Sequence, residues 1–351
     1  MRVAFVWFRA KEERESPSDR RMRRTIRLLG DAGHEVVVLC PKWWDGSDHE
    51  VEVDDVTYRA VTADRAEGTF ATKLPGALRR VRPDVIHAQS DPPSAVLAAS
   101  LGSSVTRAPL VVDWYEHRSG SGRLLRRAAT AGDAVVVPSR TVKTHVREIG
   151  VAGGDITVIP DPVDLDLICE TDPEEPVDVV FSRRLDDDAN AGILFLALAE
   201  IRDREWTAVV VGDGPERETY ERQARDLRID DRVDFRGTLS IDERVALFKG
   251  AHVFVQTATR EAFARDLLWA LACGCVGVVE YQALSSAHEL IEQRQRGFRT
   301  TSDSELTDRI LQARSLPRRG FNEAFEGFDR ERIAERYVDC YRELVDDGGL
   351  F

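Results

Sequence analysis

Lysine is nearly absent from this 351-residue chain, although arginine is abundant. Of the 49 Lys and Arg residues, five are lysines: Lys11, Lys42, Lys73, Lys143 and Lys249. Aspartate and glutamate number 62, so the formal net charge at pH 7 is −13. Such an excess of acidic residues keeps a protein soluble, and with so little lysine it suits a salt-rich cytoplasm.

Long apolar runs and a disulfide framework are also lacking. No apolar run approaches the roughly 20 residues that a membrane-spanning helix needs, and residues 1–10 lack the long apolar region of a signal peptide. We therefore expect a cytoplasmic protein. The five cysteines are scattered, and only Cys273 and Cys275 stand close together. Because a lone C-x-C is a poor zinc site, we expect no metal site.

Charge is distributed unevenly along the chain. Residues 1–165 hold 24 Lys and Arg against 23 Asp and Glu (net +1), and residues 166–351 hold 25 against 39 (net −14). The first part contains arginine clusters at 20–27, 79–82 and 123–127. These clusters suit peripheral contact with anionic lipid at the inner membrane face, a phosphorylated acceptor, or simply solvated helix faces. Without interleaved aromatics or a binding motif, nucleic acid is not an expected partner.

Apolar strands alternate with amphipathic helices along the whole chain. Buried strands are predicted at 2–7, 35–39, 84–89, 110–113, 134–138 and 156–159, and again at 177–181, 207–211, 233–235, 252–256 and 276–279. This repeated β-α pattern predicts an α/β protein with two doubly wound parallel sheets. We expect one domain at 1–165 and a second at 171–328, joined by a linker rich in proline and acidic residues (161–176).

Residues 250–279 predict a βαβ crossover, with a helix at about 262–272 between two buried strands. Ligands of parallel sheets bind at the carboxyl ends of the strands, and Glu261 is expected there, at the start of the helix. A carboxylate repels phosphate and accepts hydrogen bonds from hydroxyls. The expected ligand is therefore a polyol such as a sugar, and the alternative is a solvated helix cap.

A series of motifs follows the order and spacing of one known family. They are AGHEVVVL (32–39), RPDVIHAQ (82–89), GDAVVVPS (132–139), ITVIPDPVD (156–164), SRRL (182–185), VVVGDGPER (209–217), RVDFRGTLS (232–240) and REAFARDLLWALACGCVGVV (260–279). In these motifs the chain resembles the family 4 glycosyltransferases over nearly its whole length. The resemblance implies the GT-B fold, two Rossmann-like domains facing across a cleft, with the terminal helix (329–351) packed back on the first domain.

The resemblance also implies an activity, that of a hexosyltransferase-type enzyme. Such an enzyme moves a sugar from a nucleotide diphosphate-sugar to a glycan or lipid-linked (polyprenyl-linked) acceptor with retention of configuration. No bound cofactor or metal is expected, because cationic groups and helix N-termini neutralise the leaving diphosphate. The nucleotide-sugar is then a co-substrate.

The implied site residues fall into two groups. The donor-binding residues follow the carboxyl ends of strands in the second domain: Arg184, Asn190, Asp213, Gly214, Glu261, Ala262 and Phe263. Arg184 would pair with the diphosphate through its forked donors, and Glu261 would be the catalytic residue that holds the sugar. His117 is a second catalytic candidate, on the acceptor side.

The chain departs from the family pattern at two places in the donor site. The second glutamate of the E-x7-E motif is replaced by Trp269, which favours a packing role over a base-stacking one. The lysine after G-R-L is missing, and residues 186–188 are acidic. Diphosphate binding is then expected to weaken unless another arginine takes over: Arg183, Arg260 or Arg265. A non-catalytic binding or scaffold protein and a nucleotide-sugar epimerase are the alternatives, and the sequence names neither donor nor acceptor.

Overall fold

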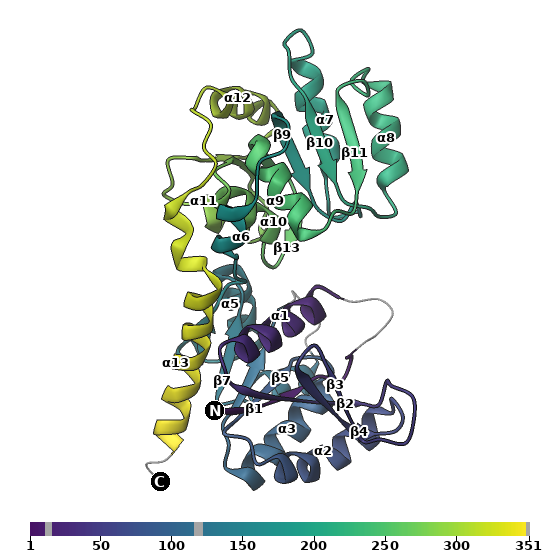
Figure 1. Ribbon diagram of the computed structural model, residues 1–351, viewed down its shortest axis with the longest axis vertical. Helices are drawn as coiled ribbons and strands as arrows, with labels where there is room; N and C mark the ends of the chain where they lie inside the picture. The colour runs from purple at the N-terminus through teal and green to yellow at the C-terminus, as the bar shows by residue number, and fades with distance from the viewer. Residues whose placement is uncertain (11–15, 116–121, 349–351) are drawn as a thin grey trace. The chain divides into compact units, whose positions relative to one another are not determined.

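The computed structural model describes residues 1–10, 16–115 and 122–348. The chain divides into two compact units, which Figure 1 shows in a colour ramp from the N- to the C-terminus. Unit 1 comprises residues 1–161 and 331–351, and unit 2 comprises residues 162–330. Each unit has its own sheet and its own hydrophobic core.

Unit 1 contains an eight-stranded sheet in the order β3-β4-β2-β1-β5-β6-β7-β8. Its strands are β1 (Arg2–Val6), β2 (Glu35–Pro41), β3 (Glu50–Val53), β4 (Val56–Thr62), β5 (Val85–Gln89), β6 (Leu110–Asp113), β7 (Ala134–Val137) and β8 (Ile156–Val158). All neighbours are parallel except the β3–β4 hairpin. Its helices are α1 (Pro17–Asp31), α2 (Glu67–Val81), α3 (Pro93–Thr106), α4 (Arg123–Ala129), α5 (Arg140–Ile149) and most of α13 (Arg330–Gly348).

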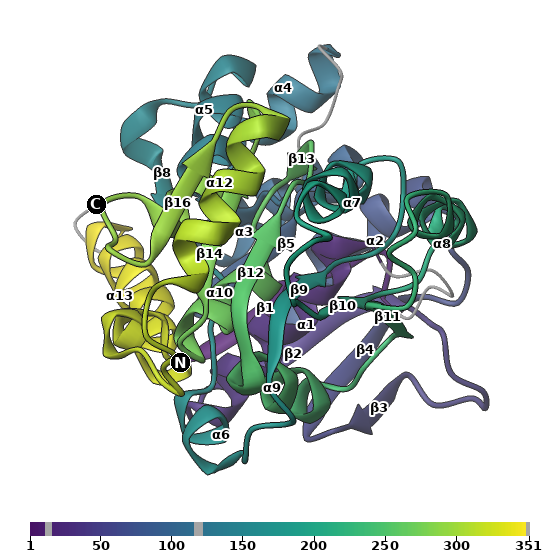
Figure 2. The same ribbon diagram turned by 90° about the horizontal axis from the view of Figure 1, so that it is seen from above.

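Unit 2 contains a six-stranded parallel sheet in the order β11-β10-β9-β12-β14-β16, which Figure 2 shows from above. Its strands are β9 (Val177–Ser182), β10 (Ala208–Val211), β11 (Val233–Gly237), β12 (Ala251–Gln256), β14 (Val276–Glu280) and β16 (Gly297–Thr300). Two short strands, β13 (Arg260–Glu261) and β15 (Leu284–Ser285), pair separately. Its helices are α6 (Leu165–Glu170), α7 (Ala191–Glu200), α8 (Arg217–Asp226), α9 (Ile241–Gly250), α10 (Arg265–Ala272), α11 (Ala287–Ile291) and α12 (Asp303–Arg314).

The two sheets confirm the predicted α/β fold with doubly wound parallel strands. In unit 2 the chain moves outward from β9 in one direction and then returns to start again at β12. The carboxyl ends of β9 and β12 therefore flank a topological switch point, the place where ligands of such sheets bind. Every residue of β12 and β14 is buried, as expected for strands covered by helices on both faces.

Three details of the predicted secondary structure are wrong. The helix expected at 262–272 begins at Arg265, a few residues after β13 (Arg260–Glu261), which pairs with β15. The expected linker contains α6, whose first turn is capped by the Asp164 side chain accepting from the Leu167 amide. Strand β16 was not predicted, because its GFRT sequence is short and only partly apolar. The first of these changes the setting of Glu261.

A buried ion network ties α1 and α13 to the sheet of unit 1. The Arg21 guanidinium lies 3.1 Å from Asp113 and 2.8 Å from Asp161, and it donates to the Tyr337 hydroxyl at 2.8 Å. The Tyr341 hydroxyl in turn lies 2.6 Å from the His87 ring. Burial alone would raise the pKa of Asp113, but Arg21 and His87 outweigh it and lower that pKa below the usual value. Asp113 is therefore held as a carboxylate inside the fold.

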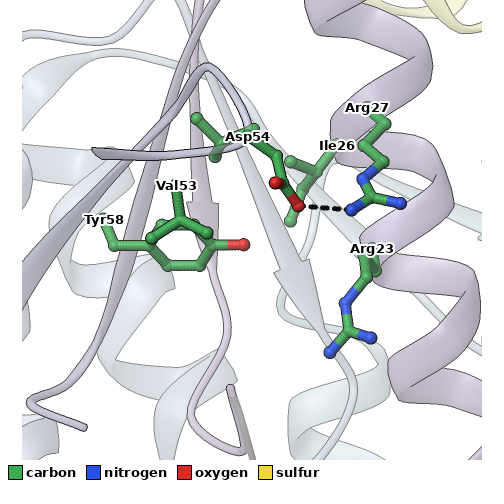
Figure 3. A pocket seen from close by; sticks show the side chains of 7 residues that line it. Arg23, Ile26, Arg27, Val53, Asp54 and Tyr58 are labelled. Atoms are coloured by element: carbon green, nitrogen blue, oxygen red, sulfur yellow. Dashed lines mark hydrogen bonds and ion pairs between the residues drawn. The ribbon is translucent and has the colours of Figure 1, made fainter. Parts of the chain in front are cut away.

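A small cavity of about 90 Å³ separates α1 from the β3–β4 hairpin. Figure 3 shows Asp54 at the tip of the hairpin, paired with Arg27 of α1, and Tyr58 on the strand below. Asp54 and Asp55 both have positive φ (53° and 59°), which matches the two-residue turns that suit the twist of a hairpin. Because the Arg27 guanidinium is already paired with the Asp54 carboxylate, we assign no ligand to this cavity.

Candidate functional site

The loops at the carboxyl ends of β9, β10 and β12 are bonded to one another. The Leu185 amide donates to the Asp213 carbonyl at 3.1 Å, which joins the loops after β9 and β10. The Thr259 amide donates to the Asp188 carbonyl at 3.0 Å, which joins the loops after β9 and β12. These bonds bring segments far apart in sequence to the switch point of the unit 2 sheet.

Two glycines after β10 permit this close approach. A Cβ atom added at Gly212 would lie 1.9 Å from the Arg183 carbonyl oxygen, and one at Gly214 would lie 2.2 Å from that of Leu185. Gly212 also has a φ of +129°, a conformation that favours glycine. The GDG turn therefore fits tightly against the loop after β9, which is a structural reason for glycine at both positions.

Gly214→Ala is expected to lower the free energy of unfolding by about 1–3 kcal/mol, because the added methyl group overlaps a backbone carbonyl. Urea denaturation followed by circular dichroism measures the change. Gly68→Ala in α2 is the matched control, since its Cβ would meet no atom within 4 Å. An equal loss in both variants would show that the close packing of the two loops contributes nothing.

Asn190 joins the loop after β12 to the end of β14. Its side-chain amide donates to the Thr257 carbonyl and to the Glu280 carboxylate, each at 3.1 Å. Asn190 is the N-cap of α7 and has a left-handed backbone (φ 53°), a conformation that asparagine tolerates well. Both amide hydrogens are thus used inside the protein, and Asn190 shapes the site.

Glu261 lies in β13, paired in register with Ser285 of β15. Its carboxylate accepts a hydrogen bond from the Arg183 guanidinium at 3.1 Å. The same guanidinium donates to the Arg260 carbonyl at 3.0 Å and lies 3.5 Å from Asp186. The side chains of Arg183 and Glu261 are 13% and 23% exposed, so the pair is mostly buried and still accessible from solvent. This pair is the centre of the candidate site.

Arg184, the arginine that the family motif singles out, stands apart from Glu261. Its side chain is 68% exposed, and its nearest ion-pair partner is Asp186 at 3.7 Å. Arg183 and Arg184 follow one another directly after β9. Sequence comparison named Arg183 only as a substitute, and only its contact with Glu261, 78 residues further along, separates the two residues.

The remaining donor-site predictions have simple structural settings. Asp213 caps its own turn, with its carboxylate accepting from the Gly214 amide at 2.8 Å. The Ala262 carbonyl accepts from the Ser286 hydroxyl at 2.9 Å, and Phe263 is buried. Neither Ala262 nor Phe263 is at a helix N-terminus, because α10 starts later. His117 lies outside the described residues.

Helix α10 carries Asp266 and, where the family pattern has its second glutamate, Trp269. Asp266, in its first turn, accepts from the Ser182 hydroxyl at 2.6 Å and from Arg244 at 2.9 Å. Trp269 is 3% exposed, with the Arg265 guanidinium 5.2 Å from its ring centroid. Its burial agrees with a packing role. No sequence pattern predicted that Asp266 links β9 to α9.

Among the described residues, no three His, Cys, Asp or Glu side chains are grouped so that they could hold a metal ion. In the same part of the chain, no helix combines the length and the apolar character needed to cross a bilayer.

Two family models match consecutive parts of the chain. Residues 19–167 match the model described as Glycosyltransferase Family 4, and residues 170–323 match Glycosyl transferases group 1. The chain belongs to the family 4 glycosyltransferases. The gap between the two matches falls close to the boundary between units 1 and 2 of this glycosyltransferase, and the GT-B assignment is confirmed.

Curated relatives and solved structures agree with this assignment. The transferase is 28% identical over 150 residues to N-acetyl-alpha-D-glucosaminyl L-malate synthase of Bacillus anthracis, a match that spans 40% of this chain and 38% of that protein. It is 26% identical to the GDP-mannose-dependent alpha-(1-6)-phosphatidylinositol monomannoside mannosyltransferase of Mycobacterium tuberculosis, over 83% of this chain and 80% of that one. HepE of Anabaena, solved with UDP, shares the fold with a TM-score of 0.75 at 20% identity, covering 98% of this chain and all of that one.

Proposed function

We propose that this glycosyltransferase moves a sugar from a nucleotide diphosphate-sugar to a glycan or lipid-linked acceptor, with retention of configuration. The observation that carries the proposal is the Arg183–Glu261 pair at the switch point of the unit 2 sheet. One relative uses GDP-mannose and acts on a phosphatidylinositol mannoside, and one structural neighbour was solved with UDP. Both are consistent with a nucleotide-sugar donor and a glycan or lipid acceptor.

Arg183 is the proposed diphosphate ligand, with Arg184 as an exposed second cation. Negative charge builds up on the diphosphate as the glycosidic bond breaks, and preorganised cations stabilise that charge. Arg183 is preorganised, because Glu261 and the Arg260 carbonyl already fix its guanidinium. The fork of guanidinium donors suits two phosphate oxygens at once.

Glu261 is the proposed sugar ligand. In the structure its carboxylate is paired with Arg183. When a diphosphate engages Arg183, the carboxylate is released to accept hydrogen bonds from sugar hydroxyls. Donor binding thus exchanges one ion pair for two sets of contacts with the ligand. The Asn190, Asp213 and Gly214 positions support the loops that carry these two residues.

A panel of nucleotide diphosphate-sugars tests the proposal by thermal denaturation and by turnover. A donor present at about 100 times its Kd stabilises a protein by about 2.7 kcal/mol, so the cognate donor is expected to raise the Tm by several degrees. Glu261→Ala is expected to abolish turnover. If no nucleotide-sugar raises the Tm even at millimolar concentration, the proposal fails.

The same panel distinguishes the two alternatives. A nucleotide-sugar consumed without any acceptor, with inversion at C2, would identify an epimerase. A nucleotide-sugar that binds and is never consumed, whatever acceptor is offered, would identify a non-catalytic binding protein.

A further inference from the structure

Three helices of unit 1 have almost no acidic residues, although the chain contains 62 Asp and Glu. Helix α2 has a single acid, Glu67, at its start. Helix α3 has no charged residue at all, and α4 has three arginines and no acid. In a chain with a net charge of −13, a surface of this kind requires an explanation.

These three helices adjoin one another. Figure 1 shows α2 and α3 next to each other beneath the unit 1 sheet. Their packing is close, because a Cβ added at Gly102 of α3 would lie 2.2 Å from the Leu78 side chain of α2. Helix α3 also packs against α4. The outer sides of α3 and α4 and the end of α2 therefore belong to one region of unit 1.

The most exposed large apolar side chains among the described residues lie on α3 and α4. Leu101 is 64% exposed, Val105 is 55% exposed and Leu124 is 54% exposed. Leu101 and Val105 are four residues apart, so they lie on the same side of α3. Single exposed leucines are common, but the three most exposed large apolar side chains all lie on these two adjoining helices, and such a concentration favours an interaction site.

Exposed arginines lie on or at the ends of the same three helices. The exposed ones lie at the end of α2, at the end of α3 and on α4: Arg79, Arg80, Arg82, Arg107, Arg123, Arg126 and Arg127. Within the described part of the chain, the side chains of Arg79, Arg80 and Arg82 make no ion pair. With Arg2 and Gly76 they line an open hollow of about 740 Å³. The positive charge of Arg79, Arg80 and Arg82 is therefore available to a binding partner.

We propose that this arginine–leucine face, made of the exposed apolar residues and arginines just named, docks on an anionic lipid bilayer. Arginine side chains close to an anionic membrane surface are attracted to it, and apolar side chains are stabilised by entering the acyl boundary. The hollow at the end of α2 receives a lipid phosphate. An anionic bilayer repels acidic side chains, and the rest of this chain is anionic. The face can dock because it has so few acidic residues.

Other occupants fit the face less well. Two copies meeting through it on a two-fold axis would bring like-charged arginines together. Nucleic acid would leave Leu101, Val105 and Leu124 without an apolar partner, and these helices present no aromatic residue for base stacking. The face lies in unit 1, so it is independent of the proposed donor site in unit 2.

Vesicle co-sedimentation of the full chain, without donor or acceptor, tests the proposal. Vesicles of phosphatidylcholine with about 30% phosphatidylglycerol should bind the protein at least tenfold more tightly than phosphatidylcholine alone, and added salt should weaken binding. The triple variants Leu101→Ser/Val105→Ser/Leu124→Ser and Arg79→Gln/Arg80→Gln/Arg82→Gln should each lose at least tenfold.

The matched control places the same changes on exposed residues of unit 2: Leu196→Ser, Arg202→Gln and Arg225→Gln. It should bind vesicles as the unchanged protein does. Thermal denaturation of each variant establishes that it is folded. Equal binding to neutral vesicles, an equal loss in the control, or a dimer in solution that the apolar variant dissociates would overturn the proposal.

Discussion

Arg21→Met is expected to lower the free energy of unfolding by about 3–5 kcal/mol, the cost of leaving one side of a buried ion pair without its partner. Arg21 is 1% exposed and neutralises two carboxylates, Asp113 at 4% and Asp161 at 1% exposure. Methionine fills much of the same volume, so most of the loss is electrostatic. The variant also leaves the Ile159 carbonyl and the Tyr337 hydroxyl without the donor they have in the structure.

Urea denaturation, monitored by tryptophan fluorescence, measures this loss. Arg27→Met is the matched control on the same helix, since its pair with Asp54 is more than half exposed on both sides. Such surface pairs contribute about 0–1 kcal/mol. If both variants lose the same amount, the buried network contributes no more than a surface pair, and our account of unit 1 is wrong.

Arg183→Ala is expected to lower kcat/KM by about 10- to 150-fold, because one charge-assisted hydrogen bond contributes about 1.5–3 kcal/mol. The change removes the proposed diphosphate ligand and leaves the Glu261 carboxylate without its partner at 3.1 Å. Arg184→Ala should cost less than about tenfold, since that side chain is 68% exposed. Steady-state kinetics with the donor identified by the panel gives both values.

The double variant Arg183→Ala/Glu261→Gln sharpens this prediction. Because the two side chains contact each other, their separate effects on kcat/KM should not add. Arg183→Lys keeps the charge but loses the fork of donors, so it should recover only part of the activity. A larger loss for Arg184→Ala than for Arg183→Ala would assign the diphosphate to Arg184, as the family motif implies.

Local pattern was enough to predict most of the fold. The repeated apolar strands and amphipathic helices gave both parallel sheets, because strands buried on two faces leave a clear signal in sequence. The motif around Glu261 also led to the correct edge of the unit 2 sheet. Where the prediction failed, the contact that determines the structure joins residues far apart in the chain.

Arg183 and Arg21 illustrate such contacts. Arg183 and Arg184 are identical in charge and adjacent in sequence, and only the pairing of β13 with β15 places Glu261 beside the first of them. Arg21 belongs to an arginine cluster that suggested a surface, yet its partners Asp113 and Asp161 stand 92 and 140 residues further along. Neither arrangement has a local sequence signal.

Helix α13 has a consequence for the order in which the protein folds during synthesis. The ribosome releases α13 after unit 2, although Ile333, Tyr337 and Tyr341 of this helix complete the core of unit 1. Domains generally fold as units. Residues 1–161 are therefore made before unit 2, but unit 1 is completed after it. Until then the charge of Arg21 lacks the hydroxyl of Tyr337.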